Sequence, residues 1–395
     1  DDTGLIGRRL REVRAWRGLS LRAAAELAGL SASYLSRIER GERPVERRST
    51  LQALAAALRV APSELTGQPF APSNEPAADG HTSIESVREA LRRIELGDLA
   101  EPVPVDGLVG RVDAARAASL RCDYQQLGAA LPGLALDTVS TADAGSARAR
   151  SLVVPVMRMT FQLVKDLGFN DVAWQVVGHA HRAAQVDGDP AWIALTQFDR
   201  ARAMVGTNAP RAALKLVHQA ADEVKLGKGT EAEAYGMLRL SAALQSAITG
   251  ADTDIPALLD DAEDVAGHTG EGNFGDMSFG PRNVAIWRMM LAVESGDLGR
   301  VPELAADVDV AAIPSLDRQG SYYLDLGRGL TQLRGRETDA VEALSRSEAI
   351  APQLVHANPY ARETVAELLR RARRDAGGRE LRGMASVSYT HLRAH

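Results

Sequence analysis

The sequence has few of the residues from which disulfides, cysteine-bound metal centres and membrane spans are built. Cys122 is the single cysteine in 395 residues, so no intrachain disulfide and no metal site made of cysteines can form. No apolar run approaches the roughly 18 residues that a membrane-spanning helix needs, and the first residues, Asp-Asp-Thr-Gly, do not resemble a signal peptide. These absences predict a cytoplasmic protein with no membrane partner.

Aromatic residues and lysine are also scarce. Aromatic side chains make up 4% of the chain and apolar residues 45%, which favours closely packed helices over an aromatic-rich β-sandwich. Lysine occurs at only four positions, so arginine supplies nearly all of the positive charge, a bias typical of bacteria with GC-rich genes. We therefore predict a bacterial, all-α protein, and the chain length suggests two domains.

The negative net charge argues against nucleic-acid binding along the whole chain. The formal net charge is −6, but it is unevenly distributed. Residues 1–70 hold twelve arginines and eight acidic residues, a balance of +4, whereas the remaining residues carry −10. Any surface for nucleic acid is therefore predicted at the N-terminus.

Five short helices are predicted in residues 4–66, because apolar residues recur there at helical spacing. The expected boundaries are Gly18 at the end of the first helix, Ser20 and Gly29 around residues 21–28, Ser31 and Gly41 around residues 32–40, Ser49 or Thr50 at the start of the fourth, and Pro62 in the fifth. Residues 1–66 are predicted to form one domain.

Residues 25–41 read Ala-Glu-Leu-Ala-Gly-Leu-Ser-Ala-Ser-Tyr-Leu-Ser-Arg-Ile-Glu-Arg-Gly. Small Ala25 allows two helices to approach closely, and Gly29 permits a tight turn between them. Leu35 anchors the second helix in the core, while Ser31 leaves the N-terminus of that helix facing outward. A helix end presented in this way can enter a DNA major groove, which is about 12 Å wide.

This string, followed by Arg43-Pro44 and by residues 54–58, closely resembles the XRE-type (Cro/repressor-like) family of helix-turn-helix transcriptional regulators across residues 5–66. The resemblance implies a sequence-specific regulator that binds double-stranded DNA. By position, the residues that it implies for reading base edges are Ala32, Ser33, Tyr34, Ser36 and Arg37. The fork of Arg37 suits guanine, which accepts two hydrogen bonds in the major groove.

The resemblance also assigns roles outside the recognition helix. The residues implied for holding DNA phosphates are Ser20, Arg22, Arg43, Arg47 and Arg48. Arg14 and Glu39 occupy the positions of a structural ion pair. One departure concerns Leu21, because the family often has a glutamine just after the cap of the second helix.

The segment 67–82 contains several prolines and small polar residues and no periodic apolar pattern, so we predict a linker. The last ten residues, 386–395, differ in composition from the helical sequence before them. They resemble translated sequencing-adapter sequence, and we exclude them from the predicted fold.

Between these segments, residues 83–385 are predicted to form stacked helical hairpins. Glycines recur at intervals of 38 to 46 residues, at Gly128, Gly168, Gly206, Gly250, Gly296 and Gly335. Predicted hairpins pair residues 191–205 with 210–224, and 284–295 with 300–308. The last unit resembles a tetratricopeptide repeat (TPR), with Ala340 and Leu344 in packing positions and Pro352 as terminator. We expect a TPR-like solenoid, and an irregular helical bundle is the alternative.

Three short motifs suggest chemistry but lack its context. Residues 270–275 match G-x-G-x-x-G without a preceding strand, and we expect a glycine-rich loop that ends at Pro281. His179 and His181 are two residues apart, whereas a zinc site on a helix needs a spacing of about four. Residues 187–189 are expected to form a turn before Pro190. We predict no enzyme, no metal and no cofactor.

A solenoid offers a surface for an effector, and polar or aromatic residues near helix starts are candidates to line it. These are Arg282, Asn283, Trp287, Gln319, Tyr322 and Tyr323, for each of which packing or capping is the alternative. Trp174, Trp192 and Phe198 are expected in the core. In regulators of the kind that this sequence resembles, the TPR-like domain responds to a peptide or a small molecule, or it forms the dimer.

The function hypothesis is therefore a homodimeric regulator associated with the nucleoid, in which the helical domain dimerises or receives a peptide or small-molecule signal. The alternative is a protein-interaction scaffold or an antitoxin-like partner with secondary DNA binding. An enzyme that carries a DNA-binding appendage is a third class.

Overall fold

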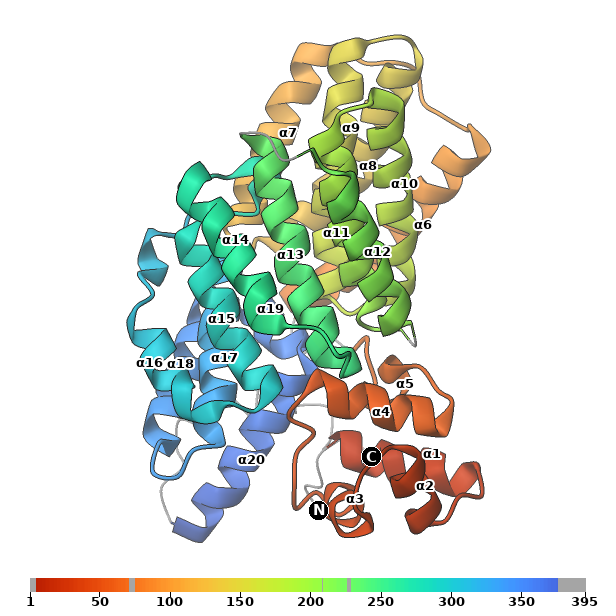
Figure 1. Cartoon of the computed structure of the whole chain (residues 1–395). Coiled ribbons are helices and arrows are strands. Elements are labelled where there is room, and N and C mark those ends of the chain that lie inside the picture. Colours follow the sequence, from red (N-terminus) through yellow and green to blue (C-terminus); the bar gives the residue numbers. More distant parts are fainter. Residues whose placement is uncertain (1–4, 71–74, 208, 226–228, 376–395) are drawn as a thin grey trace.

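A computed structural model describes residues 5–70, 75–207, 209–225 and 229–375 of the chain, and within these ranges it contains helices and no strand (Figure 1). The predicted fold class, five short N-terminal helices followed by helical hairpins, is confirmed. None of the described helices has the length and apolar character to cross a membrane.

The first five helices form a unit with its own apolar core, which we call the N-terminal unit. They are α1 (Leu5–Trp16), α2 (Leu21–Leu27), α3 (Ala32–Glu39), α4 (Arg48–Leu58) and α5 (Pro62–Thr66). Leu10, Leu35 and Leu54 are fully buried in this core. Gly7 lets α1 approach α3, because a Cβ there would clash with the carbonyl oxygen of Ile38.

The boundaries of α1 to α3 lie where the sequence predicted them, within two residues. The predicted start of the fourth helix was wrong: α4 begins at Arg48, and its N-cap residue Arg47 makes no side-chain cap hydrogen bond. Neither Ser49 nor Thr50 caps it, since both already lie inside the helix.

The remaining helices form an array that we call the helical array. Its members are α6 (Glu75–Leu96), α7 (Val105–Leu120), α8 (Tyr124–Asp143), α9 (Ala147–Asp166), α10 (Asn170–Asp187), α11 (Pro190–Met204), α12 (Pro210–Glu223), α13 (Thr230–Thr249), α14 (Ile255–Thr269), α15 (Pro281–Ser295), α16 (Val301–Ala306), α17 (Leu316–Thr331), α18 (Glu337–Ile350), α19 (Pro352–Ala357) and α20 (Pro359–Asp375). Three single 3₁₀ turns are η1 (Phe274–Asp276), η2 (Leu298–Arg300) and η3 (Val310–Ala312).

Consecutive helices of the array pack as hairpins that follow one another through space in chain order (Figure 1). Five of the six glycines that predicted the repeat lie between the paired helices, from Gly168 between α9 and α10 to Gly335 between α17 and α18. The sixth was misread: Gly128 is buried inside α8. A glycine can serve a turn or a close helix contact, and spacing alone does not distinguish the two.

Other expectations concern the linker, Pro352, Trp174 and the last ten residues. The predicted linker 67–82 is too long, because α6 begins at Glu75. Pro352 follows the end of α18, as expected for the terminator of the last unit, and it starts α19, which α20 follows. Trp174 is not a core residue, since 42% of its surface is exposed. The prediction for 386–395 lies outside the described residues.

Residues 270–280 and 187–189, which match short motifs in the sequence, both connect helices. Residues 270–280 connect α14 to α15 with only the short turn η1, and Pro281 starts α15 as predicted. Asp189 accepts hydrogen bonds from the backbone N–H groups of Ala191 and Trp192 and so caps α11 behind Pro190. Neither loop has the strand context of a dinucleotide site or the ligands of a calcium loop.

The N-terminal unit lies against one end of the helical array (Figure 1). Helix α4 contacts the C-terminal end of α13, while α2 and α3 lie on the side away from the array. Tyr360 of α20 joins the apolar core of the N-terminal unit. We call the α4 side the inner face of the N-terminal unit and the α2–α3 side its outer face.

Candidate nucleic-acid interface

Two serine caps and one glycine turn set the direction of α3. Ser20 Oγ accepts a hydrogen bond of 3.1 Å from the backbone N–H of Ala23, and Ser31 Oγ accepts one of 3.2 Å from Tyr34. Gly29 has a φ of +65°, a conformation that side chains with a Cβ rarely adopt. As a result the first residues of α3 lie at the outer face, where Ser33 is exposed.

The side chains of α3 differ in how far they are already engaged. Arg37, one turn after Ser33, makes no ion pair and no side-chain hydrogen bond within the described part of the chain. The hydroxyl of Ser36, in contrast, accepts a hydrogen bond from Arg40, which also forms an ion pair with Glu42. Of these residues, Ser33 and Arg37 are therefore the ones free to contact another molecule.

Ala32 and Tyr34 are half-buried beside them. Burial raises the pKa of the Tyr34 hydroxyl, and the nearby carboxylate of Glu46 adds to this effect. Tyr34 is thus neutral at physiological pH and can act as a hydrogen-bond donor beside the arginines of the outer face.

Arg14 and Glu39 form a bidentate ion pair between α1 and α3. Arg14 Nε lies 2.6 Å from Glu39 Oε1, and Arg14 Nη2 lies 2.9 Å from Glu39 Oε2. The hydrogen bond to Glu39 raises the pKa of Arg14. Glu39 is buried, so this pair fixes α3 against α1 and does not face a ligand.

The five residues implied for phosphate contact divide between the two faces. Arg22 and Arg43 are exposed on the outer face, and Ser20 is exposed while its hydroxyl caps α2. Arg47 and Arg48 turn toward the array instead, and Arg47 Nη1 lies 3.5 Å from the carbonyl oxygen of Ser295. In this conformation Arg48 is not free for DNA, a correction to the role that we expected, whereas the hydrogen bond of Arg47 is long and exposed and its phosphate role stays a prediction.

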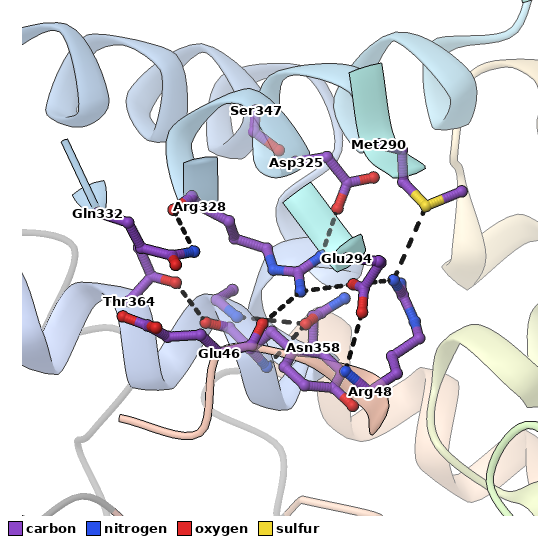
Figure 2. A network of polar contacts seen from close by, with 12 residues as sticks. Glu46, Arg48, Met290, Glu294, Asp325, Arg328, Gln332, Ser347, Asn358 and Thr364 are labelled. Carbon is purple, nitrogen blue, oxygen red and sulfur yellow. Dashed lines mark hydrogen bonds and ion pairs between the residues drawn. The ribbon is translucent and has the colours of Figure 1, made fainter. Parts of the chain in front are cut away.

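Arg48 is part of a buried polar network between the N-terminal unit and the array (Figure 2). Its guanidinium pairs with Glu294 of α15, and its backbone N–H donates a hydrogen bond of 2.9 Å to the same carboxylate. Arg328 of α17 approaches Glu294 from the other side at 2.8 Å. Arg328 also donates to the carbonyl oxygen of Glu46 at 2.7 Å and pairs with Asp325.

The network holds Glu294 in its ionised form. Burial by itself would raise the pKa of this carboxyl group, but the charges of Arg48 and Arg328 outweigh burial, so the pKa lies below its usual value. Both guanidinium groups also lie over the ring of Tyr360, at 5.4 Å and 4.7 Å from its centroid. Removal of one partner from such a buried pair leaves a charge without compensation.

Further contacts extend this docking along the inner face. Gln52 Nε2 donates hydrogen bonds of 2.9 Å to the carbonyl oxygens of Val205 and Thr207, which follow α11. The backbone N–H of Ile6 donates to Glu363 of α20 at 3.2 Å. Sequence reasoning missed all of these residues. The only local signal was a polar Gln52 among the apolar residues of α4.

The structure brings together only two of the six residues predicted for an effector pocket. Asn283 and Trp287 line a cavity of about 460 Å³ inside the array. Arg282 pairs with Glu271 at the surface, and Gln319 donates a hydrogen bond to the carbonyl oxygen of Ile313. Tyr322 donates to the carbonyl oxygen of Ala305, 2.9 Å away.

Tyr323, the sixth candidate, packs edge-on against Tyr322, and Arg346 lies over its ring. Neither tyrosine lines the cavity. Its other walls come from residues that we had not singled out for binding, such as Arg318 and Lys165, and from Trp192 and Phe198, which we had assigned to the core.

The two histidines of α10 have separate partners. His181 is buried and its Nδ1 lies 2.9 Å from Thr196 Oγ1, while His179 lies 3.3 Å from Glu95. Burial, with the charge of Arg200, lowers the pKa of His181 to about 4. Among the described residues no group of three or more His, Cys, Asp or Glu side chains is placed to hold a metal ion.

Residues 5–66, the five helices of the N-terminal unit, match the family model of a helix-turn-helix domain. The N-terminal unit is therefore a helix-turn-helix domain, the class of fold that many DNA-binding transcriptional regulators share.

Comparison with individual proteins agrees with this class. The chain is 36% identical over 87 residues to RghRB of Bacillus subtilis (strain 168), described as an uncharacterised helix-turn-helix-type transcriptional regulator. The match covers 22% of this chain and 55% of RghRB, so it spans about half of that relative. The chain is thus similar to helix-turn-helix regulators.

Among solved structures, the apo form of the competence regulator ComR from Streptococcus vestibularis aligns with 88% of this chain and 97% of its own, at 12% identity and a TM-score of 0.20. That score is too low for the ComR structure to support an argument about this chain.

Proposed function

We propose that the protein is a sequence-specific DNA-binding transcriptional regulator. The proposal rests on the outer face of the N-terminal unit. There α3 presents Ser33 and an unengaged Arg37, and Arg22 and Arg43 are exposed. In this arrangement Arg37 reads a guanine, with Ala32, Ser33, Tyr34 and Ser36 beside it, and Arg22 and Arg43 hold phosphates.

The helical array is the regulatory part of this proposal. It assembles two copies into a homodimer in the bacterial cytoplasm, and a peptide or small-molecule effector binds to it. A ligand that binds one conformation of the array more tightly shifts the population of that conformation and with it the spacing of the two recognition helices. Two half-sites about 34 Å apart are expected in the operator.

Selection of DNA sequences from a random pool by the purified full chain tests the proposal. We expect an enriched motif with two half-sites that contain a conserved guanine. The variant Arg37→Ala should lose preference at that guanine, whereas Arg346→Ala, which removes an exposed, ion-paired arginine of the array, should select the same motif. If the unaltered chain enriches no motif, the proposal is wrong.

A second candidate, a protein-interaction scaffold or antitoxin-like partner with secondary DNA binding, is favoured by one observation. Trp16 and Leu27 of the N-terminal unit are 77% and 63% exposed. Exposed apolar side chains of this size suit a protein contact. This candidate predicts partners that are captured equally well by the chain and by its Arg37→Ala variant, without DNA.

A further inference from the structure

The cavity of about 460 Å³ in the array is closed on one side by the loop 270–280, which we call the strap. The carbonyl oxygen of Gly275 in the strap accepts a hydrogen bond from Arg158 of α9, and Asp276 pairs with Arg116 of α7 at 2.8 Å. The ring of Phe274 lies 4.4 Å from that of Trp192. The cavity has the size of a small-molecule site rather than a packing defect.

Three buried polar atoms on the wall of this cavity have no hydrogen-bond partner among the described residues. They are the donors Arg318 Nη2 and Trp287 Nε1 and the acceptor Asp317 Oδ1. Only 7% of the surface of Trp287 is exposed. The guanidinium group of Arg318 lies over its ring. A buried polar atom without a partner is unfavourable, so the two donors at one cavity indicate an occupant that supplies hydrogen-bond acceptors.

The charge around the cavity indicates the sign of that occupant. Six cationic and four acidic side chains line it, and four of the cations are ion-paired, which leaves Lys165 and Arg318 without a close carboxylate. The ammonium group of Lys165 has its nearest carboxylate, Asp166, only at 3.8 Å. Burial lowers the pKa of Lys165, and it lowers that of Arg318 to about 10. An anion beside these two groups would relieve that destabilisation.

The other residues that line the cavity limit the charge and the shape of the ligand that it can hold. Asp166 and Asp317 also line the cavity, and burial together with the charge of Asp166 raises the pKa of Asp317 to about 6. A second negative charge on the ligand would be repelled by these carboxyl groups, so a monoanion fits better than a dianion. The rings of Trp192, Trp287 and Phe274 offer apolar surface for the rest of the ligand.

We propose that the cavity beneath the strap binds an organic monocarboxylate with an apolar body, whose carboxylate accepts hydrogen bonds from Arg318 and Trp287. Such a carboxylate can belong to a free organic acid or to the C-terminus of a short peptide. This ligand would be the effector of the regulator proposed above, and its effect on DNA binding rests on that proposed function. Arg48 of α4 lines the same cavity, so a bound anion lies next to the network that docks the N-terminal unit.

Calorimetric titration of the full chain without DNA tests the binding directly. The probes are octanoate and phenylacetate, their neutral primary amides, octyl phosphate, and a tripeptide with a free or an amidated C-terminus. At least one carboxylate should bind with an affinity better than 1 mM, and its amide should bind at least tenfold more weakly. The free acids and the tripeptide arms distinguish the two sources of the carboxylate.

Variants localise the site. Arg318→Gln should weaken carboxylate binding at least tenfold and Trp287→Phe several-fold, while Arg288→Gln, on α15 but paired with α14 outside the cavity, should leave it unchanged. If Arg318→Gln does not fold, Trp287→Phe and the comparison of acids with amides still decide. The proposal is overturned if no carboxylate binds, if amides or octyl phosphate bind as tightly, or if Arg318→Gln binds normally. Carboxylate binding without any selected DNA motif would instead contradict the regulator proposal alone.

Discussion

The two faces of the helix-turn-helix domain use the same residue type in different ways. On the outer face, Arg22, Arg37 and Arg43 make no ion pair within the described ranges. On the inner face, Arg48 is fixed to Glu294 by its side chain and by its backbone. The net positive charge of the first 70 residues therefore does not tell which arginines can reach DNA; their neighbours in the fold decide it.

Loss of Glu294 should break the inner face with the largest effect. In Glu294→Ala, Arg48 and Arg328 lose their common partner inside the protein, and we expect the free energy of unfolding to fall by about 3–5 kcal/mol. Urea denaturation measures it. The exposed pair of Glu342 with Arg346 supplies the control, since Glu342→Ala should cost less than about 1 kcal/mol. Equal losses in the two variants would mean that the network does not stabilise the docking.

Acid should weaken the inner face. The pKa of Glu294 is lowered in the fold, so its contribution to stability is complete above its usual pKa of 4.5 and is lost as the pH falls through the lower folded value. The difference in Tm between the protein and Glu294→Gln should thus be constant from pH 8 to pH 5 and shrink below pH 4.5. A difference that shrinks as the pH rises would contradict this sign.

Loss of Arg37 should break the outer face without affecting stability. Removal of a bidentate contact to guanine costs about 1–3 kcal/mol, so we expect Arg37→Ala to bind the selected operator about 5- to 150-fold more weakly. Affinity for unrelated DNA should change far less. Fluorescence anisotropy with both DNAs measures this ratio, and an equal loss on both would assign Arg37 to phosphate contact.

The cap of α3 should give a smaller effect. Ser31→Ala removes the side-chain acceptor for the backbone N–H of Tyr34, and we expect a loss of about 1 kcal/mol in unfolding free energy. Ser49, which the sequence suggested as a cap but which lies inside α4, is the matched control. A larger loss of unfolding free energy for Ser49→Ala than for Ser31→Ala would contradict the assignment of Ser31 as a cap and of Ser49 as a residue inside the helix.

Local features of the fold could be predicted from the sequence, and long-range contacts could not. Ser20, Ser31 and Gly29 act within a few residues of themselves, so their roles follow from the chain around them. The hairpin repeat followed from glycine spacing because most of those glycines end a helix. Gly128 misled because it lies buried inside α8, and spacing alone does not distinguish a glycine within a helix from one at its end.

The family resemblance placed Arg37 on a helix, α3, that lies at the outer face (Figure 1), and its role in base reading stays a prediction. The resemblance also assigned Arg48 to a phosphate, because the isolated motif contains no partner for it. Glu294 lies 246 residues from Arg48 in the sequence, and only the stacked array brings the two together. Most residues that line the cavity were not predicted for the same reason, since its walls come from several hairpins and from the strap.

The salt dependence of operator binding, compared between Arg43→Ala and Arg48→Ala, tests the contrast between the faces most directly. A residue that holds a phosphate releases about one counterion, so its removal lowers the slope of log affinity against log salt by about one. We predict this change for Arg43→Ala and no change for Arg48→Ala. The reverse result, a lower slope only for Arg48→Ala, would contradict the assignment of the outer face to DNA and of the inner face to docking.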